Sequence, residues 1–142
     1  METSGARGVE ASEKKTEVRR VRASDAVSSS LESKLRILGD AITELDTDIL
    51  DREVLSLALG REMDREISDL EFELKEVKHR TLGGIETMEA RRLALEREVL
   101  ALKHEKRGEY VRAWADISAL RRKRREFVME FDNLMRTVSA LW

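Results

Sequence analysis

Apolar residues recur along most of the chain at alternating steps of four and three residues. Leucine or isoleucine fills every position of the first run: Leu31, Leu35, Leu38, Ile42, Leu45 and Ile49. A second run repeats these steps: Met63, Ile67, Leu70, Leu74 and Val77. Heptad spacing of this kind places apolar side chains along one face of an α-helix, the seam of a coiled coil. The runs are out of phase by four residues, which predicts a stutter between about 50 and 62.

The second half of the chain has the same organisation. Its first run is Ile85, Met88, Arg92, Leu95, Val99 and Leu102. Its second run is Ile117, Leu120, Arg124, Phe127, Phe131, Leu134, Val138 and Leu141. The offset of four residues between these runs predicts another stutter between about 103 and 113. If the chain folds back between its two halves, at Gly83 and Gly84, residue i faces roughly residue 167 − i. The stutter of the first half then lies beside the stutter of the second half.

Gly83 and Gly84 are the only paired glycines in a chain that has no proline. Glycine inside a helix costs about 0.5–1 kcal/mol relative to alanine, whereas at a helix end it supplies the left-handed conformation. We therefore predict a turn at Gly83 and Gly84 and an all-α fold, an extended antiparallel two-helix coiled-coil hairpin. A straight rod and a three-helix fold are alternatives, the latter because Leu-Gly recurs at 38–39, 59–60 and 82–83.

Charge and composition divide the chain into four parts. Residues 1–30 lack a sustained apolar period and are predicted to form a flexible polar and basic arm, with Ser30 as a helix N-cap. An acidic helix over 31–81, a turn over 82–84 and a basic helix over 85–142 follow. Residues 31–84 carry 8 basic and 14 acidic side chains, and residues 85–142 carry 13 and 10. Helices of opposite net charge attract when they lie side by side.

The overall composition is typical of coiled coils, with 39% charged and 4% aromatic residues. The absence of cysteine excludes disulfides and thiol nucleophiles. No run approaches 18 consecutive apolar residues, which argues against a membrane span. We expect a cytoplasmic protein, with cytoskeletal association open and a nuclear location as the alternative.

The C-terminal end carries apolar residues over more than half of the helix circumference. Such a helix is buried by more than one neighbour, so we predict a partner-binding surface there together with the start of the first heptad run. Its residues are Leu31, Leu35, Leu38, Phe127, Phe131, Leu134, Met135, Val138, Leu141 and Trp142. The occupant is either the chain itself with a second copy, or a different protein with Phe131 and Trp142 as aromatic anchors.

Three arginines, Arg52, Arg92 and Arg124, occupy seam positions. A charged residue in a heptad core costs stability and often selects register or partner. The predicted register places Arg52 across from Trp114, within reach of a cation–π contact. The alternative is that only the aliphatic stems are buried while the guanidinium groups extend to solvent.

Two basic runs lie at 14–22 and 121–125. Their candidate contact residues are Arg19, Arg20, Arg22, Arg121, Arg122, Lys123, Arg124 and Arg125. Either run is suited to an anionic polymer such as a nucleic acid. Five consecutive helical residues point all round the helix, however, so we favour salt bridges with the acidic helix for 121–125.

No motif with catalytic spacing is present. Glu76-x-x-His79 has the spacing of bundle di-iron sites, but such sites need the motif twice. Gly83 and Gly84 lack the further glycines and the lysine of a phosphate loop. No catalytic residue, cofactor, metal ion or small-molecule substrate is predicted, so we do not expect an enzyme.

The sequence favours a non-enzymatic structural or adaptor subunit that assembles by helix–helix packing into a larger complex of cytoskeletal, ciliary or tethering type. Its expected partners are other coiled-coil chains or copies of itself. A nucleic-acid-associated coiled coil using 14–22 and 121–125 is the main alternative. A SNARE-like helix with a polar arginine layer is a third, although no membrane anchor is apparent.

Overall fold

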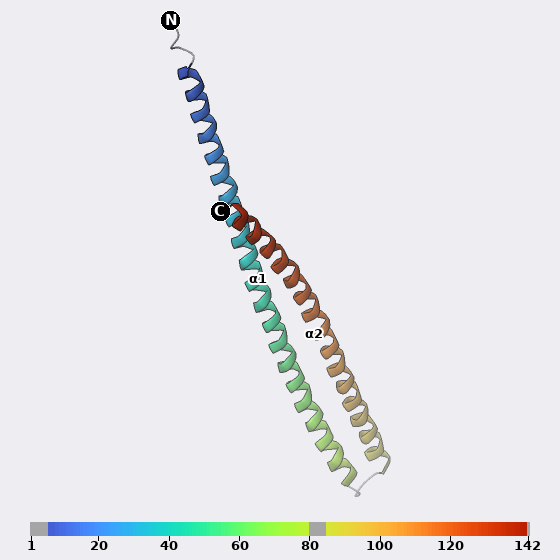
Figure 1. Cartoon of the computed structure of the whole chain (residues 1–142). Helices are drawn as coiled ribbons and strands as arrows, with labels where there is room; N and C mark the ends of the chain where they lie inside the picture. The colour runs from blue at the N-terminus through green and yellow to red at the C-terminus, as the bar shows by residue number, and fades with distance from the viewer. Residues whose placement is uncertain (1–5, 80–84, 142) are drawn as a thin grey trace. The chain divides into compact units, whose positions relative to one another are not determined.

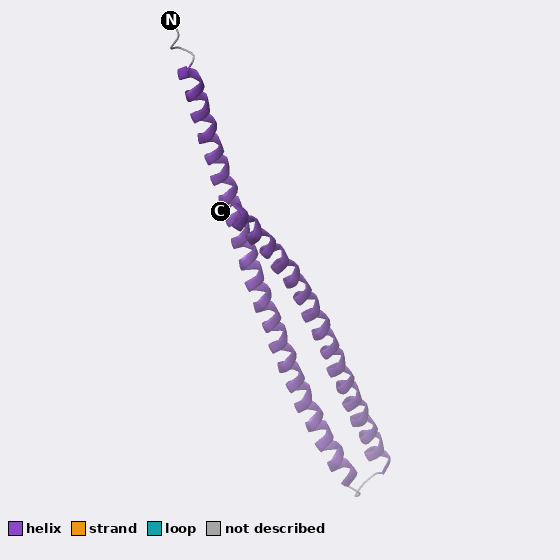
Figure 2. Cartoon of the chain, in the orientation of Figure 1, coloured by secondary structure: helices purple, strands orange, loops and turns teal. Residues whose placement is uncertain are grey.

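The chain folds into two long α-helices. In a computed structural model of the protein, α1 spans Ala6–His79 and α2 spans Ile85–Leu141. The structure describes the backbone of these two ranges and the side chains of residues 25–78 and 88–141. Throughout these ranges the backbone is helical and no strand occurs (Figures 1 and 2). The predicted all-α two-helix hairpin is therefore confirmed, while the predicted turn at Gly83 and Gly84 lies outside the described residues.

The predicted helix start at Leu31 with Ser30 as its N-cap is wrong. Helix α1 already begins at Ala6, so most of the segment predicted as a flexible arm has a helical backbone. The segment 6–30 lacks a seam, but it also lacks proline and is rich in Ala, Glu, Lys and Arg. These residues have high helix propensity, and intrinsic propensity extends a helix without any packing partner.

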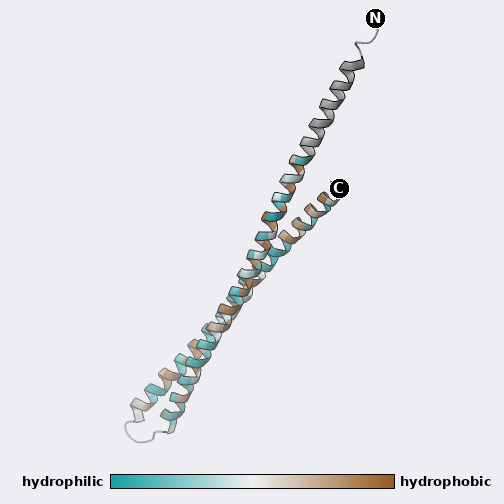
Figure 3. Ribbon diagram, turned by 90° about the vertical axis from the view of Figure 1, so that its left-hand side faces the viewer, coloured by the Kyte–Doolittle hydropathy of each residue, from teal (hydrophilic) through white to brown (hydrophobic). Residues whose placement is uncertain are grey.

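Contacts divide the chain into two units, each described here by itself. Unit 1 comprises the described residues up to Glu44 and from Arg124 onward, and unit 2 is Leu45–Lys123. Each unit contains a segment of α1 and a segment of α2. Hydrophobic and hydrophilic residues are interspersed along both helices (Figure 3), and no part of the described helices is apolar over a length that would cross a bilayer.

Ion pairs in unit 2 establish that the helices are antiparallel. Glu53 on α1 pairs with Arg121 on α2, and Asp64, further along α1, pairs with Lys106, which comes earlier on α2. Glu73, further still, pairs with Arg91. The predicted register would place Glu53 opposite residue 114 and Asp64 opposite residue 103, so it is correct to within about two helical turns.

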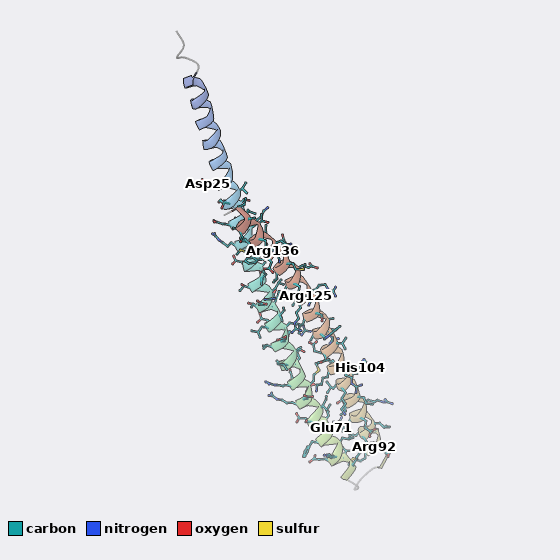
Figure 4. All side chains as sticks on the ribbon, in the orientation of Figure 1. Asp25, Glu71, Arg92, His104, Arg125 and Arg136 are labelled. Atoms are coloured by element: carbon teal, nitrogen blue, oxygen red, sulfur yellow. The ribbon has the colours of Figure 1, made fainter. Side chains whose placement is uncertain are left out.

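The core of unit 2 is narrow. Among the described residues, only five hydrophobic side chains are buried: Leu45, Ile67, Leu95, Val99 and Ala113. Four of these occupy predicted seam positions, and Leu95 has no exposed surface. Side chains from both helices occupy the space between the two ribbons of this unit (Figure 4). Two helices that share one seam bury little else, because each has only one neighbour.

Unit 1 has no fully buried side chain among its described residues 25–44 and 124–141. The helices nevertheless meet, since a Cβ atom added at Gly39 would lie 3.9 Å from Cε2 of Phe131. Leu31, Leu35 and Leu38 are half-buried. This unit is therefore packed along one seam that remains partly open to solvent.

Leu95 and Leu93 provide a matched test of the core. Replacing the buried Leu95 by alanine leaves a cavity in the seam and is expected to lower the free energy of unfolding by about 2–5 kcal/mol. Leu93 is 44% exposed, so Leu93→Ala is expected to cost less than about 1 kcal/mol. Urea denaturation followed by circular dichroism, at equal protein concentrations, measures both. Equal losses for the two variants would contradict the packing described for α2.

Candidate protein-interaction surface

A cluster of four charged residues interrupts the apolar seam of unit 2: Arg52, Glu109, Asp116 and the exposed Arg112, whose Nε lies 3.5 Å from Oε2 of Glu109. Nη1 of Arg52 lies 2.7 Å from Oε1 of Glu109, and its Nε donates a hydrogen bond of 3.0 Å to Oδ2 of Asp116. The side chains of Arg52 and Glu109 are only 17% and 11% exposed, whereas Asp116 is 60% exposed. Nη1 and Oε1 are both shielded from solvent, so the two charges meet as a close ion pair inside the seam.

This cluster lies where the heptad pattern breaks. Arg52 belongs to the first predicted stutter and Glu109 to the second, so the two irregular stretches do lie side by side. The contact with Glu109, followed by the hydrogen bond to Asp116, raises the pKa of Arg52 above its ordinary value. A charge buried in a seam favours the one register in which it meets its counter-charge. We infer that Arg52 and Glu109 help to fix the alignment of α1 with α2.

The predicted cation–π contact between Arg52 and Trp114 is wrong. Arg52 lines a groove with Leu55 and Asp116 on one side of unit 2. Trp114 is 67% exposed and lines a groove on the other side with Leu57. Two carboxylates compete successfully for the guanidinium because charge-assisted contacts, one of them shielded from solvent, are stronger than a cation–π contact at an exposed ring.

The groove containing Trp114 is the main candidate for an interaction surface. We call it the aromatic groove, and the side of unit 2 on which it lies the aromatic face. It has a volume of about 580 Å³. Its apolar lining consists of Leu57, Gly60, Tyr110, Ala113, Trp114 and Ile117. Leu57, Tyr110 and Trp114 are 62%, 73% and 67% exposed, and a Cβ atom at Gly60 would meet no other atom within 4 Å. Exposed aromatic residues beside an open groove are typical of protein–protein contact sites.

Three ion pairs cross the aromatic face, each with its carboxylate on α1 and its cation on α2. They join Glu53 to Arg121 at 3.1 Å, Asp64 to Lys106 at 2.5 Å and Glu71 to Lys103 at 3.3 Å. The first two pairs line the aromatic groove itself, and Lys103 lines an adjoining groove with Tyr110. The aromatic face therefore has a mainly acidic edge on α1, where the exposed Arg61 lies between Glu53 and Asp64, an apolar middle, and a basic edge on α2.

The opposite side of unit 2, which we call the acidic face, differs in charge. One of its grooves contains Asp48, Asp51 and Asp116, with Arg52 and Lys123 as the basic residues. A second groove has only acidic charged residues in its lining: Glu66, Asp69, Glu98 and Glu105. Here both helices contribute carboxylates, so the acidic face has no division into an acidic and a basic edge.

The described partner-binding residues that were predicted from the sequence fall in unit 1. Phe127, Phe131, Leu134 and Val138 are half-buried, as are Leu31, Leu35 and Leu38. Met135 and Leu141 are 44% and 60% exposed, and Trp142 lies outside the described residues. The structure thus brings the two predicted segments into one unit, and their binding to a partner stays a prediction.

The predicted basic contacts are divided in the structure. Arg121 pairs with Glu53, as we favoured for this run, and Lys123 lines the acidic face. Arg122 and Arg125 are exposed and Arg124 is half-buried. Arg19, Arg20 and Arg22 lie in helical backbone, and their side chains are outside the described part of the chain. The remaining seam arginine, Arg92, lies 3.6 Å from both Glu89 and Glu96 on its own helix.

The aromatic groove was missed in the sequence because Leu57 and Tyr110 fall within the stutters and Trp114 directly follows the second one, where no seam was assigned. A weak signal was present, since Leu50, Val54 and Leu57 recur at steps of four and three outside the seam. Among the residues searched, no group of His, Cys, Asp and Glu side chains could hold a metal ion. No protein-family model, curated protein or solved structure matches the chain.

The charged cluster can be tested with a double-mutant cycle. Arg52→Leu leaves the buried Glu109 with only the exposed Arg112 beside it and is expected to lower Tm by about 5 °C or more, whereas Glu109→Leu leaves Arg52 paired with Asp116 and is expected to lower Tm less. The double variant removes both charges and is expected to recover most of that loss, because apolar residues pack well in a seam. Thermal unfolding followed by circular dichroism measures the cycle.

The exposed pair Glu73 and Arg91 provides the control, since the two side chains are 43% and 51% exposed. The corresponding leucine variants are expected to change Tm only slightly, because exposed ion pairs contribute little. Strictly additive losses at Arg52 and Glu109 would show that these residues do not act as a pair.

Proposed function

We propose that this protein is a non-enzymatic structural or adaptor subunit that assembles with other helical chains through helix–helix packing. The observation that carries the proposal is the imbalance of apolar surface. Within the described residues, five hydrophobic side chains are buried, whereas the exposed large hydrophobic residues are three times as numerous. They are Val27, Ile37, Leu50, Val54, Leu55, Leu57, Phe72, Leu93, Leu100, Tyr110, Val111, Trp114, Met129, Met135 and Leu141.

The distribution of these residues supports assembly. Met129, Met135 and Leu141 lie on the C-terminal segment of α2, where the sequence predicts a partner surface. Tyr110 and Trp114 line the aromatic groove of unit 2. Apolar surface gathered at defined places is typical of proteins that bury it against a partner. Partners of coiled-coil type are proposed because long heptad helices are recognised by helices of matching length.

A role in a cytoskeletal, ciliary or tethering complex follows from this architecture as a proposal. A long pair of helices spans distance with few residues, since each residue adds about 1.5 Å along the axis. The absence of a catalytic constellation in the sequence supports a role in which the chain holds other proteins in position.

The proposal can be tested by capturing partners with the tagged full-length chain and two variants of its C-terminal segment. Leu141→Glu places a carboxylate on the predicted docking end and is expected to reduce recovery of partner chains by about tenfold or more, because a buried charge without a counter-charge is costly. Ser139→Glu, at an exposed position two residues away, is expected to leave recovery unchanged. Circular dichroism verifies that both variants keep their helix content.

Two outcomes would contradict the proposal. One is a stable monomer, by size-exclusion chromatography with light scattering, that captures no protein. The other is recovery of a nucleic acid whose binding weakens steeply with salt and is lost on reversing the charges of Arg122 and Arg125, which would favour the alternative function.

A further inference from the structure

We infer that the aromatic face of unit 2 binds the same face of a second copy of this chain, so that each α1 lies across α2 of the other copy. The inference rests on the proposed function and specifies its partner. It is drawn from two properties of the aromatic face: the apolar groove at its centre and the opposite charges of its two edges.

A groove of this kind is suited to a second copy because the same surface provides both the cavity and a side chain to fill it. Gly60 and Ala113 leave space in the groove, and Leu57 projects beside it with 62% of its surface exposed. Leu50 and Val54 extend the apolar row from Leu57 along α1, and they are 58% and 56% exposed. An interface between identical copies about a two-fold axis requires this self-complementarity.

Charge selects one orientation of the two copies. A two-fold axis parallel to the helices places α1 of each copy over α2 of the other. The edge of α1 with Glu53, Asp64 and Glu71 then faces a basic edge formed by Arg121, Lys106 and Lys103, and these three carboxylates outweigh the one cation of that edge, Arg61. A two-fold axis perpendicular to the helices would instead place acidic edge on acidic edge, and like charges across an interface disfavour that arrangement.

Charge also selects the face. Contact between two acidic faces would bring together carboxylates from both helices, among them Glu66, Asp69, Glu98 and Glu105. No lysine or arginine lines that groove to compensate them. The aromatic face is therefore the side on which two copies attract one another.

The orientation predicts which residues meet. Rotation about an axis parallel to the helices leaves every residue at its own height along that axis. Leu57 on α1 is level with Tyr110 and Trp114 on α2, since all three line one groove. Leu57 of one copy is therefore expected to contact Tyr110 and Trp114 of the other, with four antiparallel neighbouring helices around a shared apolar centre.

The first test compares two exposed leucines of α1. Leu57→Glu places a carboxylate in the centre of the interface and is expected to raise the dimer dissociation constant at least about tenfold. Leu55→Glu is the matched control, because Leu55 is 51% exposed and lines the acidic face. Sedimentation equilibrium of the full-length chain measures both, and circular dichroism verifies the fold. A monomeric wild-type chain, or equal effects of the two variants, would overturn the inference.

The second test locates the axis by cross-linking, which the lack of native cysteine makes possible. A mixture of Leu57→Cys and Trp114→Cys chains is expected to form a disulfide-linked dimer on mild oxidation, whereas either variant alone is expected to cross-link several-fold less. Efficient cross-linking of Leu57→Cys alone would mean that α1 lies over α1, and would overturn the orientation.

Failure of this inference can be distinguished from failure of the proposed function. If the chain is monomeric but Leu57→Glu abolishes capture of a different helical protein, the groove binds that protein, and the inference is wrong while the function stands. If the chain neither associates with itself nor captures another protein, both are wrong.

Discussion

The properties of this protein depend on the limited burial that two helices achieve when each has only one neighbour. In unit 2 the seam is one side chain wide, and Leu95 is its only large side chain without exposed surface among the described residues. Ordering a residue costs about 1–2 kcal/mol in backbone entropy, and a narrow seam returns only part of that. Further burial must come from surfaces outside the seam, such as the aromatic groove and the partly open seam of unit 1.

The sequence predicted the fold well where periodicity was strong. Leu45, Ile67, Leu95 and Val99 are buried at the seam positions that the heptad runs assigned to them. Matched stutters predicted the fold-back, and the contact of Arg52 with Glu109 shows that these irregular stretches meet. Periodicity succeeds here because a heptad seam reports directly which side of a helix is covered.

Prediction failed where the controlling interaction was not periodic. The early start of α1 at Ala6 reflects helix propensity, which the search for a seam disregarded. The partners of Arg52 were misassigned because an error of a few residues in register decides which side chain is met. At the predicted register Trp114 was the nearest candidate, whereas the observed partners Glu109 and Asp116 lie less than two turns before it and less than one turn after it. The aromatic groove was missed because its apolar residues lie beside the seam on both helices, and only Ile117 among them belongs to a predicted heptad run.

The three exposed ion pairs of the aromatic face affect specificity more than stability. Glu53, Asp64 and Glu71 are each 40% or more exposed in their pairs, and exposed pairs contribute about 0–1 kcal/mol each. Their common direction matters more than their strength, because in these three pairs each carboxylate is on α1 and each cation is on α2. A surface with ordered edges of opposite sign attracts a partner in one orientation and repels it in the reverse one. The same three pairs that join the helices therefore also define how a further pair of helices can approach, and the apolar groove between them supplies the burial that the seam alone does not.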